Sequence, residues 1–501
     1  MKLAVRIDSS KIVCSASEGI GRPQIIQDSV FKDDTESPVA ISFSGNTMLI
    51  GKLAEVNRGV AQAIHPVVFS SDFLTSDVPV AESSAGALWS GAALTAMIIK
   101  KSIRDASAQY LSNVTSVNLI VPSYLSIRQL RMLDKARTLL GSISCDFVEG
   151  AVAAVSYFLS KEPVSEKILL VLETNDDVLS ITAIAAGRDK LQILSREHVM
   201  GFGDRFILDA ISDILKGQIT AIAKLSTQEM TLLGDELNMR SKQILESFMR
   251  SNETQHCWLL AGDSIVRASI SVAALQEALK PKMDTLVRRI HSCLSDVELQ
   301  AMDIDKVLLC GKIWEWKHAC RFIEQSITDF TGRLDFDEAA LRVVLGGGRY
   351  KLRGDLVELR ENWQPRLVTV SLFSISVRQQ NGVEDVLILK NAPLPCQSTI
   401  TIHRPALSRD GRIVMELVQM LPNDMKDSFL FIESEEQFDF SAGNFELILK
   451  MQDNMNLGIK LKDLTNRRDV KIMVKSAGKT PFGVQHEEEQ LVSNTPLNSA
   501  V

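Results

Sequence analysis

The spacing of apolar and polar residues divides the chain into regions that predict different folds. Residues 1–350 alternate short apolar runs with stretches of helical period, a pattern typical of an α/β domain with a parallel or mixed sheet. Residues 367–478 hold short strand-like pieces separated by Gly, Asn, Asp and Pro, which predicts an all-β sandwich. Between them, the charged residues 351–366 predict a linker, and residues 479–501 are too polar to pack and predict a disordered tail.

Residues 168–184 predict a strand, a tight turn and a second strand, and the turn holds Glu173, Asp176 and Asp177. A hairpin that cradles phosphate normally carries glycines there, because glycine lets backbone N–H groups approach the phosphate oxygens. Carboxylates beside a polyphosphate would instead repel it by roughly 4 kcal/mol per close charge pair at an intermediate dielectric. The three successive glycines at residues 346–348 follow a predicted helix and predict its C-terminal stop instead of a phosphate loop.

Composition narrows the classes of function. The 501 residues are 45% apolar and 23% charged with a net charge of −7, which gives no reason to expect nucleic acid as a partner. Seven cysteines without CxxC spacing indicate a reducing compartment, for which we expect the cytoplasm. The N-terminus shows no signal-like segment, no run approaches 18 apolar residues, and the histidines lack metal-binding spacing. We therefore expect no membrane association and no metal site.

Short motifs follow a definite order along the first region. Residues 117–124 predict a strand that ends in Val-Pro-x-Tyr, and residues 149–157 read Glu-Gly-Ala-Val-Ala-Ala-Val-Ser-Tyr. Asp8 in the opening hairpin, residues 203–206 and residues 307–311 add further matching pieces. In this order the chain resembles the DnaK-type seventy-kilodalton heat-shock chaperones. It resembles a divergent member, similar to the atypical ribosome-associated proteins of that superfamily.

The resemblance implies a two-lobed, actin-like nucleotide-binding domain followed by the β-sandwich that clamps an extended apolar peptide in the family. Only about 23 residues follow the sandwich, so we expect the family's helical lid to be absent. The fold class expected is thus α/β plus all-β, without a lid.

The resemblance also implies a nucleotide site, on residues that depart from the family's pattern. The first phosphate loop, Asp-Leu-Gly-Thr-Thr in the family, is residues 8–12 here and has no glycine, although Asp8 would still orient a metal-bound water. The second loop is the acidic turn that begins at Glu173. Glu149 matches the carboxylate of the family's Glu-Pro-Thr motif but is followed by Gly150 instead of proline. The family's catalytic lysine has no counterpart, and Asp8, Glu149 and Glu173 are interpreted as vestigial catalytic residues.

The positions that contact nucleotide in the family are altered as well. Trp314 stands where the family has the arginine that stacks on adenine, and it either stacks on a base or, as is more usual at a helix start, packs in the interior. Lys242 matches a lysine beside the adenosine, with a solvated helix lysine as the other reading. Trp314, Trp316 or Lys312 would fill the cleft if no nucleotide does. The vestigial nucleotide-contacting residues are Ser9, Ser10, Lys11, Gly203, Lys242, Gly311, Lys312 and Trp314.

These departures predict a pseudo-ATPase, because phosphoryl transfer depends on positioning and charge neutralisation, and several groups have changed at once. We expect no cofactor, with weak binding of ATP or ADP and magnesium as the alternative. The predicted function is a chaperone scaffold or regulatory partner in protein folding, acting with a J-domain protein, another heat-shock chaperone or the ribosome. A nucleotide-independent module that holds unfolded peptide is the alternative. A weak ATP-dependent chaperone, in which Lys11 and Lys312 supply positive charge, is the second alternative.

Overall fold

The computed structural model divides the chain into two compact units. The first unit comprises Met1–Glu166, Ile184–Arg196 and Val343–Val501, and the second comprises Lys167–Ala183 and Glu197–Arg342. The structure describes residues 1–8, 10–18, 22–45, 47–56, 63–74, 79–162, 165–175, 177–187, 190–203, 205–222, 227–261, 264–350, 366–379, 382–403, 405, 407–421, 425–438, 443–452, 456–476 and 485–497.

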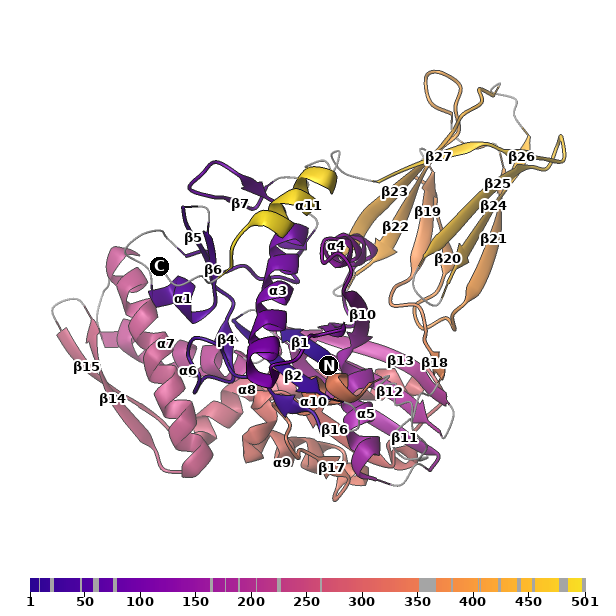
Figure 1. Cartoon of the computed structure of the whole chain (residues 1–501). Helices are drawn as coiled ribbons and strands as arrows, with labels where there is room; N and C mark the ends of the chain where they lie inside the picture. The colour runs from indigo at the N-terminus through magenta and orange to yellow at the C-terminus, as the bar shows by residue number, and fades with distance from the viewer. Residues whose placement is uncertain are drawn as a thin grey trace. The chain divides into compact units, whose positions relative to one another are not determined.

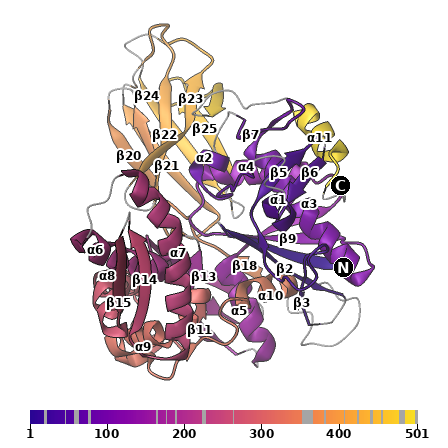
Figure 2. The ribbon, with the colours of Figure 1, turned by 90° about the vertical axis from the view of Figure 1, so that its left-hand side faces the viewer.

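A mixed sheet forms the centre of the first unit. Its strands are β1 (Lys2–Ile7), β2 (Lys11–Ser17), β3 (Gln24–Ile25), β4 (Ser37–Pro38), β9 (Ser116–Val121) and β10 (Ser144–Glu149). The order is β10-β9-β1-β2-β3, with β4 also paired to β2. β1 and β2 form the predicted opening hairpin, whereas β9 runs parallel to β1. Figure 2 shows β2, β3 and β9 of this sheet. Parallel pairing of separate strands requires helical crossovers, which the predicted α/β pattern supplies.

The helices of the first unit begin where the sequence provides caps. Ser90 caps the first turn of α3 by accepting from the backbone N–H of Ala93, and Ser126 and Gln129 form a capping box on α4. The helices are α1 (Lys52–Val56), α2 (Ser71–Leu74), α3 (Gly91–Tyr110), α4 (Ile127–Thr138), α5 (Gly150–Lys161) and α10 (Arg342–Arg349), which starts at the unit boundary. Two hairpins accompany them, β5 (Ile41–Ser44) with β6 (Thr47–Ile50) and β7 (Ala81–Glu82) with β8 (Leu88–Trp89).

The three glycines at residues 346–348 lie inside helix α10, so the expectation that they end a helix is wrong. A Cβ added at Gly346 would lie 1.7 Å from the carbonyl oxygen of Ala153, and one at Gly347 would lie 2.6 Å from Cδ1 of Ile120. Real Cβ atoms do not approach so closely. The glycines therefore allow α10 to pack directly on α5 and β9, a close approach that outweighs their low helix propensity.

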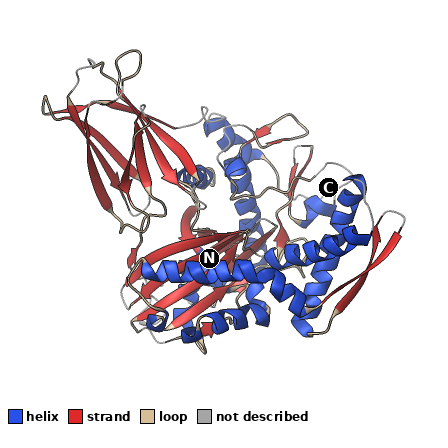
Figure 3. Cartoon of the chain, turned by 180° about the vertical axis from the view of Figure 1, so that it is seen from behind, coloured by secondary structure: helices blue, strands red, loops and turns tan. Residues whose placement is uncertain are grey.

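The predicted β-sandwich is present in the first unit. Its strands are β19 (Ile375–Gln379), β20 (Glu384–Ile388), β21 (Cys396–His403), β22 (Val414–Met420), β23 (Lys426–Ser434), β24 (Asn444–Met451), β25 (Leu457–Asp463), β26 (Arg468–Val470) and β27 (Ile472–Ser476). They form two sheets, β20-β19-β22-β23-β27 and β21-β24-β25-β26, which enclose an apolar core (Figure 3). Antiparallel strands joined by turns match the short strand-like pieces of the sequence.

The second unit contains most of a second sheet and four long helices among its described residues. The sheet order is β17 (Leu334–Asp335), β16 (Lys306–Cys310), β11 (Lys167–Asn175), β12 (Val178–Ala186), β13 (Lys190–Met200) and β18 (Arg366–Val368), and the unit boundary crosses β12 and β13. The helices are α6 (Phe206–Ile222), α7 (Thr227–Arg250), α8 (Val272–Ser295) and α9 (Lys317–Ser326). Shorter pieces are η1 (Ala301–Asp303), η2 (Lys312–Glu315), η3 (Thr328–Phe330) and the hairpin of β14 (Gln255–Ala261) and β15 (Ser264–Ile270).

The connecting and terminal segments depart from expectation. Residues 351–365 of the predicted linker lie outside the described residues, and Arg366 already belongs to β18, which pairs in parallel with β13. The tail expected to be disordered contains helix α11 (Gln485–Asn494), which contacts α3 (Figure 1). Val492 on α11 is buried in the apolar core of the first unit, and this burial supplies the stabilisation that its polar sequence did not suggest.

The close approach of α10 gives a testable prediction. Gly346→Ala should lower the urea midpoint of unfolding, because the added methyl group meets backbone, and overpacking of this kind costs about 1–3 kcal/mol. Gly217→Ala is the matched control, since a Cβ at this exposed position in α6 meets nothing within 4 Å. The control should raise stability by about 0.5–1 kcal/mol through its better helix propensity. Equal effects of the two substitutions would contradict the packing account.

Candidate functional site

Asp8 follows the first strand of the opening hairpin, which ends at Ile7, and is buried against an arginine. The hairpin pairs Ile7 with Ile12, and the backbone N–H of Asp8 donates to the carbonyl of Lys11 at 2.8 Å. Arg6 and Asp8 lie two residues apart and so point to the same side of the strand. Nε of Arg6 donates to Oδ1 of Asp8 at 2.9 Å, and both side chains are at most 5% exposed. The carboxylate expected to orient a metal-bound water is therefore already held by a cation.

Lys11 closes the same turn and has a partner of its own. Its Nζ lies 3.1 Å from Oε1 of Glu36, in an ion pair that is partly buried. Ser10 is exposed, and its carbonyl accepts from the backbone N–H of Val39 at 3.1 Å. Ser9, the remaining vestigial residue of this loop, lies outside the described residues. The structure thus brings Asp8 and Lys11 together in one hairpin, each with its charge paired within the first unit.

Glu149, at the start of α5, contacts a buried arginine from β13. Nη2 of Arg196 lies 2.6 Å from each carboxylate oxygen of Glu149, and the Arg196 side chain is fully buried. The same guanidinium donates to the carbonyl of Val370 at 2.8 Å and to Oγ1 of Thr369 at 2.9 Å. Oδ1 of Asn391 accepts from the backbone N–H of Arg196 at 3.0 Å. Glu149 is therefore part of a network that reaches the segment entering the sandwich.

The N-terminus of α4 makes a second connection to the sandwich. The backbone N–H of Ile127, which helix geometry leaves without an intrahelical partner, donates to Oε1 of the buried Gln419 at 3.1 Å. Ile127 itself packs in the sandwich core, and Arg128 donates to the carbonyl of Ser428 at 2.7 Å. Burial, together with the carboxylates of Glu149 and Asp146, raises the pKa of nearby Tyr350 to about 12. The sandwich is therefore joined to the rest of the first unit by apolar packing, hydrogen bonds and the network around Arg196.

In the second unit, the acidic hairpin forms as predicted between β11 and β12. Glu173 is buried, and its Oε1 accepts from Nδ2 of Asn175 at 3.3 Å. Asp177 is exposed, and its carbonyl accepts from the backbone N–H of Phe202 at 3.2 Å. Asp176 lies outside the described residues. The glycine-free turn therefore places one carboxylate inside the unit and one at its surface.

The remaining vestigial positions of the second unit lie in ordinary structural settings. Trp314 in η2 is 1% exposed and packs against Phe202 with ring centroids 6.4 Å apart, which matches the packing role. Gly311, which directly precedes η2, has a φ of 122°, a backbone conformation that residues with a side chain rarely adopt. Lys312 is exposed. Lys242 is exposed on α7, and the carbonyl of Gly203 accepts from the backbone N–H of Phe206 at 3.1 Å.

The sequence argument missed the residues that pair with the vestigial site. Arg6 gave a local signal, since it is a charge within the buried run Leu3–Ile7 and lies two positions before Asp8. Arg196 gave none, because it lies 47 residues from Glu149 in the sequence. Within the described residues, no group of three histidine, cysteine or acidic side chains could hold a metal ion. Within the described ranges, no helix combines the length and the apolar character that crossing a bilayer requires.

Comparison with known proteins decides the family. The model of the Hsp70 protein family matches residues 45–333, more than half of the chain. The chain belongs to the Hsp70 protein family. This confirms the resemblance and the fold class expected from the motif order, an actin-like Hsp70 ATPase fold with mixed α/β sheets and a further β-rich region.

The relatives of this Hsp70-family chain are distant. It is 22% identical over 330 residues to Chaperone protein DnaK of Thermoplasma acidophilum, covering 62% of this chain and 52% of the relative. The protein of the same name from Thermoplasma volcanium matches at 22% over 331 residues with the same shares. That of Thermus thermophilus matches at 21% over 430 residues, or 79% of this chain and 67% of the relative. The chain thus spans about half the length of the Thermoplasma relatives.

The Arg196 network yields the second prediction. Glu149→Ala leaves a fully buried guanidinium without its carboxylate, and breaking a buried pair costs about 3–5 kcal/mol. We expect a lower unfolding midpoint and faster amide hydrogen exchange at residues 366–371. Asp134→Ala is the control. The side chains of Arg137 and Asp134 are 44% and 54% exposed, so their ion pair should contribute at most about 1 kcal/mol. Exchange at residues 366–371 that Glu149→Ala leaves unchanged would show that the network does not hold this segment.

Proposed function

We propose that this Hsp70-family protein does not hydrolyse ATP and acts as a chaperone scaffold or regulatory partner in protein folding. The observation that carries the proposal is the pairing of charge in the first phosphate loop. Asp8 is held by the buried Arg6, and Lys11 is paired with Glu36. A loop that receives phosphate and magnesium needs its carboxylate and its cation available to them.

The residues present do not fit a magnesium-bound polyphosphate. A carboxylate that orients metal-bound water must accept hydrogen bonds from that water, whereas Asp8 is buried and accepts from Arg6. The turn from Asp8 to Lys11 contains no glycine that would let the backbone approach phosphate. In the second unit, the corresponding turn offers the carboxylates of Glu173 and Asp177 instead of glycine N–H groups. Each departure weakens positioning or charge neutralisation, on which phosphoryl transfer depends.

The scaffold role is supported by the way in which the sandwich is attached. Arg196, Glu149 and the segment at Thr369–Val370 are joined by a buried network that involves only protein groups. Such a connection holds the segment that enters the sandwich in place, which suits a protein that presents a fixed surface. We propose as partners a J-domain protein, another heat-shock chaperone or the ribosome, as the resemblance to the atypical members suggests. We propose the cytoplasm as the compartment.

A second candidate function, holding of unfolded peptide without a nucleotide cycle, is favoured by exposed apolar side chains on the sandwich. Strand β20 is the terminal strand of its sheet among the described strands. Val386 on this strand is 56% exposed, and Val383 and Leu389 beside it are 48% and 66% exposed. Such a strand can receive an extended apolar segment.

The nucleotide proposal predicts the result of calorimetry. Titration of the full chain with ATP and ADP, with and without magnesium, should give no binding heat, and a phosphate-release assay should give no turnover. DnaK of Thermus thermophilus, measured in parallel, is the positive control. Turnover that Asp8→Asn abolishes would overturn the proposal, because it would show that the paired carboxylate still serves catalysis.

The two candidate functions predict different behaviour toward an unfolded client. A scaffold should leave the aggregation of a diluted, denatured client unchanged at equimolar full chain. A peptide-holding protein should suppress it with or without ATP, and Val386→Ser should remove that suppression. Val474→Ser, at a 46% exposed position on β27 of the same sandwich, is the matched control. Suppression that both substitutions remove equally would count against a site at β20.

A further inference from the structure

The C-terminal segment, residues 485–497, packs through buried side chains on a surface formed by α3, α4 and the β5–β6 and β7–β8 hairpins. We call this surface the seat. Val492 is 1% exposed and lies in the apolar core cluster of α3, α4 and the neighbouring strands, with Leu491 and Leu497 packed at its edge. Glu488 is 3% exposed and forms an ion pair with Lys135 of α4. Burying a carboxylate is costly unless a cation accompanies it, so Lys135 makes this seat selective for an acidic residue.

Main-chain groups of the segment are held as well. Nζ of Lys100 donates to the carbonyl of Val492 at 2.9 Å, and the guanidinium of Arg104 donates to the carbonyl of Leu497. The backbone N–H of Met48 in β6 donates to the carbonyl of Pro496 at 2.9 Å, and Met48 and Leu497 form a parallel bridge. Cations near the carbonyl end of a helix favour its macrodipole. The seat thus recognises an acidic helix followed by a short extended piece.

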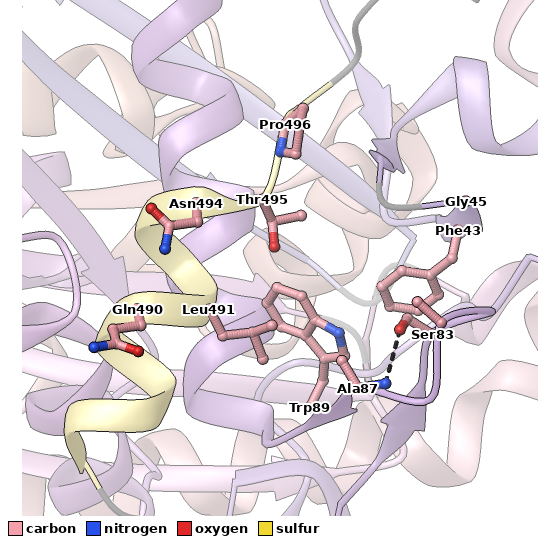
Figure 4. Close-up of a pocket in the computed structure, with 11 residues that line it drawn as sticks. Phe43, Gly45, Ser83, Ala87, Trp89, Gln490, Leu491, Asn494, Thr495 and Pro496 are labelled. Atoms are coloured by element: carbon pink, nitrogen blue, oxygen red, sulfur yellow. Dashed lines mark hydrogen bonds between the residues drawn. The ribbon is translucent and has the colours of Figure 1, made fainter.

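The segment does not fill its seat. A pocket of about 390 Å³ remains between α11 and the two hairpins, lined by Phe43, Trp89, Leu491 and Pro496 among others. Figure 4 shows the side chain of Leu491 pointing toward the Trp89 ring. Trp89 is 1% exposed, and its indole Nε1 has no hydrogen-bond partner among the described residues. The open volume beside Leu491 favours an occupant with a larger apolar side chain, because a void forfeits the contacts that its lining would otherwise make.

We propose that this seat is a docking site for an amphipathic helix of a partner protein, and that residues 485–497 are its displaceable occupant within the chain. The partner helix carries an acidic residue where Glu488 lies and apolar residues three and four positions later, where Leu491 and Val492 lie. Lys100, Arg104 and Lys135 give the seat a positive charge in a chain whose net charge is −7, which selects an acidic helix. The pocket at Trp89 accepts the partner's bulkier side chain.

Tethering makes the chain's own segment a strong competitor. A segment on a short connection acts at an effective concentration of about millimolar, so it holds the seat even if its own affinity is weak. A partner must exceed that competition, which it does by filling the pocket that Leu491 leaves open. Binding of the segment and binding of the partner are then mutually exclusive, because both use one site, and neither requires nucleotide.

The test uses the full chain and, as its probe, a fluorescein-labelled synthetic peptide of residues 485–497. Val492→Asp should dislodge the chain's own segment, because it places a carboxylate in an apolar core position. We expect the labelled peptide to bind this variant saturably in fluorescence anisotropy and to bind the unaltered chain at least about tenfold more weakly. Ser493→Asp is the matched control, since it adds the same charge at the exposed neighbouring position and should behave as the unaltered chain.

Two further measurements separate a specific site from loss of folding. Lys135→Glu added to the Val492→Asp chain should abolish peptide binding, and a peptide with Glu488→Lys should restore it by reversing the ion pair. A peptide with Leu491→Phe should bind at least about fourfold more tightly than the native peptide, because Phe is larger than Leu by more than one CH₂-sized group and each such group buried in a pocket contributes about 0.8 kcal/mol. If Val492→Asp proves unstable in circular dichroism, Glu488→Lys replaces it as the releasing substitution.

The proposal is overturned if a folded releasing variant fails to bind the peptide, or if the unaltered chain binds it equally well. Failure of the charge reversal at Lys135 would place the peptide elsewhere on the protein and would overturn it too. These outcomes are independent of whether the chain binds ATP, since no nucleotide is present in the assay.

Discussion

The buried ion pair between Arg196 and Glu149 is the interaction on which the arrangement of the first unit depends. A fully buried guanidinium must have its charge compensated, and here the carboxylate of Glu149 pairs with that charge, while Oγ1 of Thr369 and the carbonyl of Val370 accept from the Nη groups. Arg196 lies on β13, Glu149 lies between β10 and α5, and Thr369 and Val370 lie at the entry to the sandwich. Loss of either charge of the pair would therefore destabilise all of these elements. The contacts of α4 with Gln419 and Ser428 add apolar and polar support at a second point.

Charge pairing within the chain recurs at three further places in the first unit. Arg6 accompanies Asp8, Glu36 accompanies Lys11, and Lys135 accompanies Glu488 of the C-terminal helix. Each partner compensates a charge that would be costly to bury alone. Ion pairs formed within the chain favour a fixed structure over a cycle driven by a ligand. This is the physical basis of the scaffold that we propose.

The sequence predicted the elements well wherever local pattern decides them. The opening hairpin, the strand within residues 117–124, the acidic hairpin and the short strands of the sandwich follow from apolar periodicity and turn residues, and the structure contains them. The glycines at residues 346–348 and the polar segment that became α11 were misjudged for the same reason. Glycine is a poor helix former and polar residues bury little area, but close packing on α5 and burial of Val492 outweigh both tendencies.

The sequence by itself determined the family, the two kinds of fold and the absence of glycine from the turns that follow Asp8 and Glu173, because motifs and periodicities are local properties of the chain. The tertiary structure alone decided which charges meet. Arg196 lies 47 residues from Glu149, and Lys135 lies more than 350 residues from Glu488, so no local pattern could pair them. The chain forms such pairs because burial excludes water, and a charge that loses water must then find its counterion wherever the fold brings one.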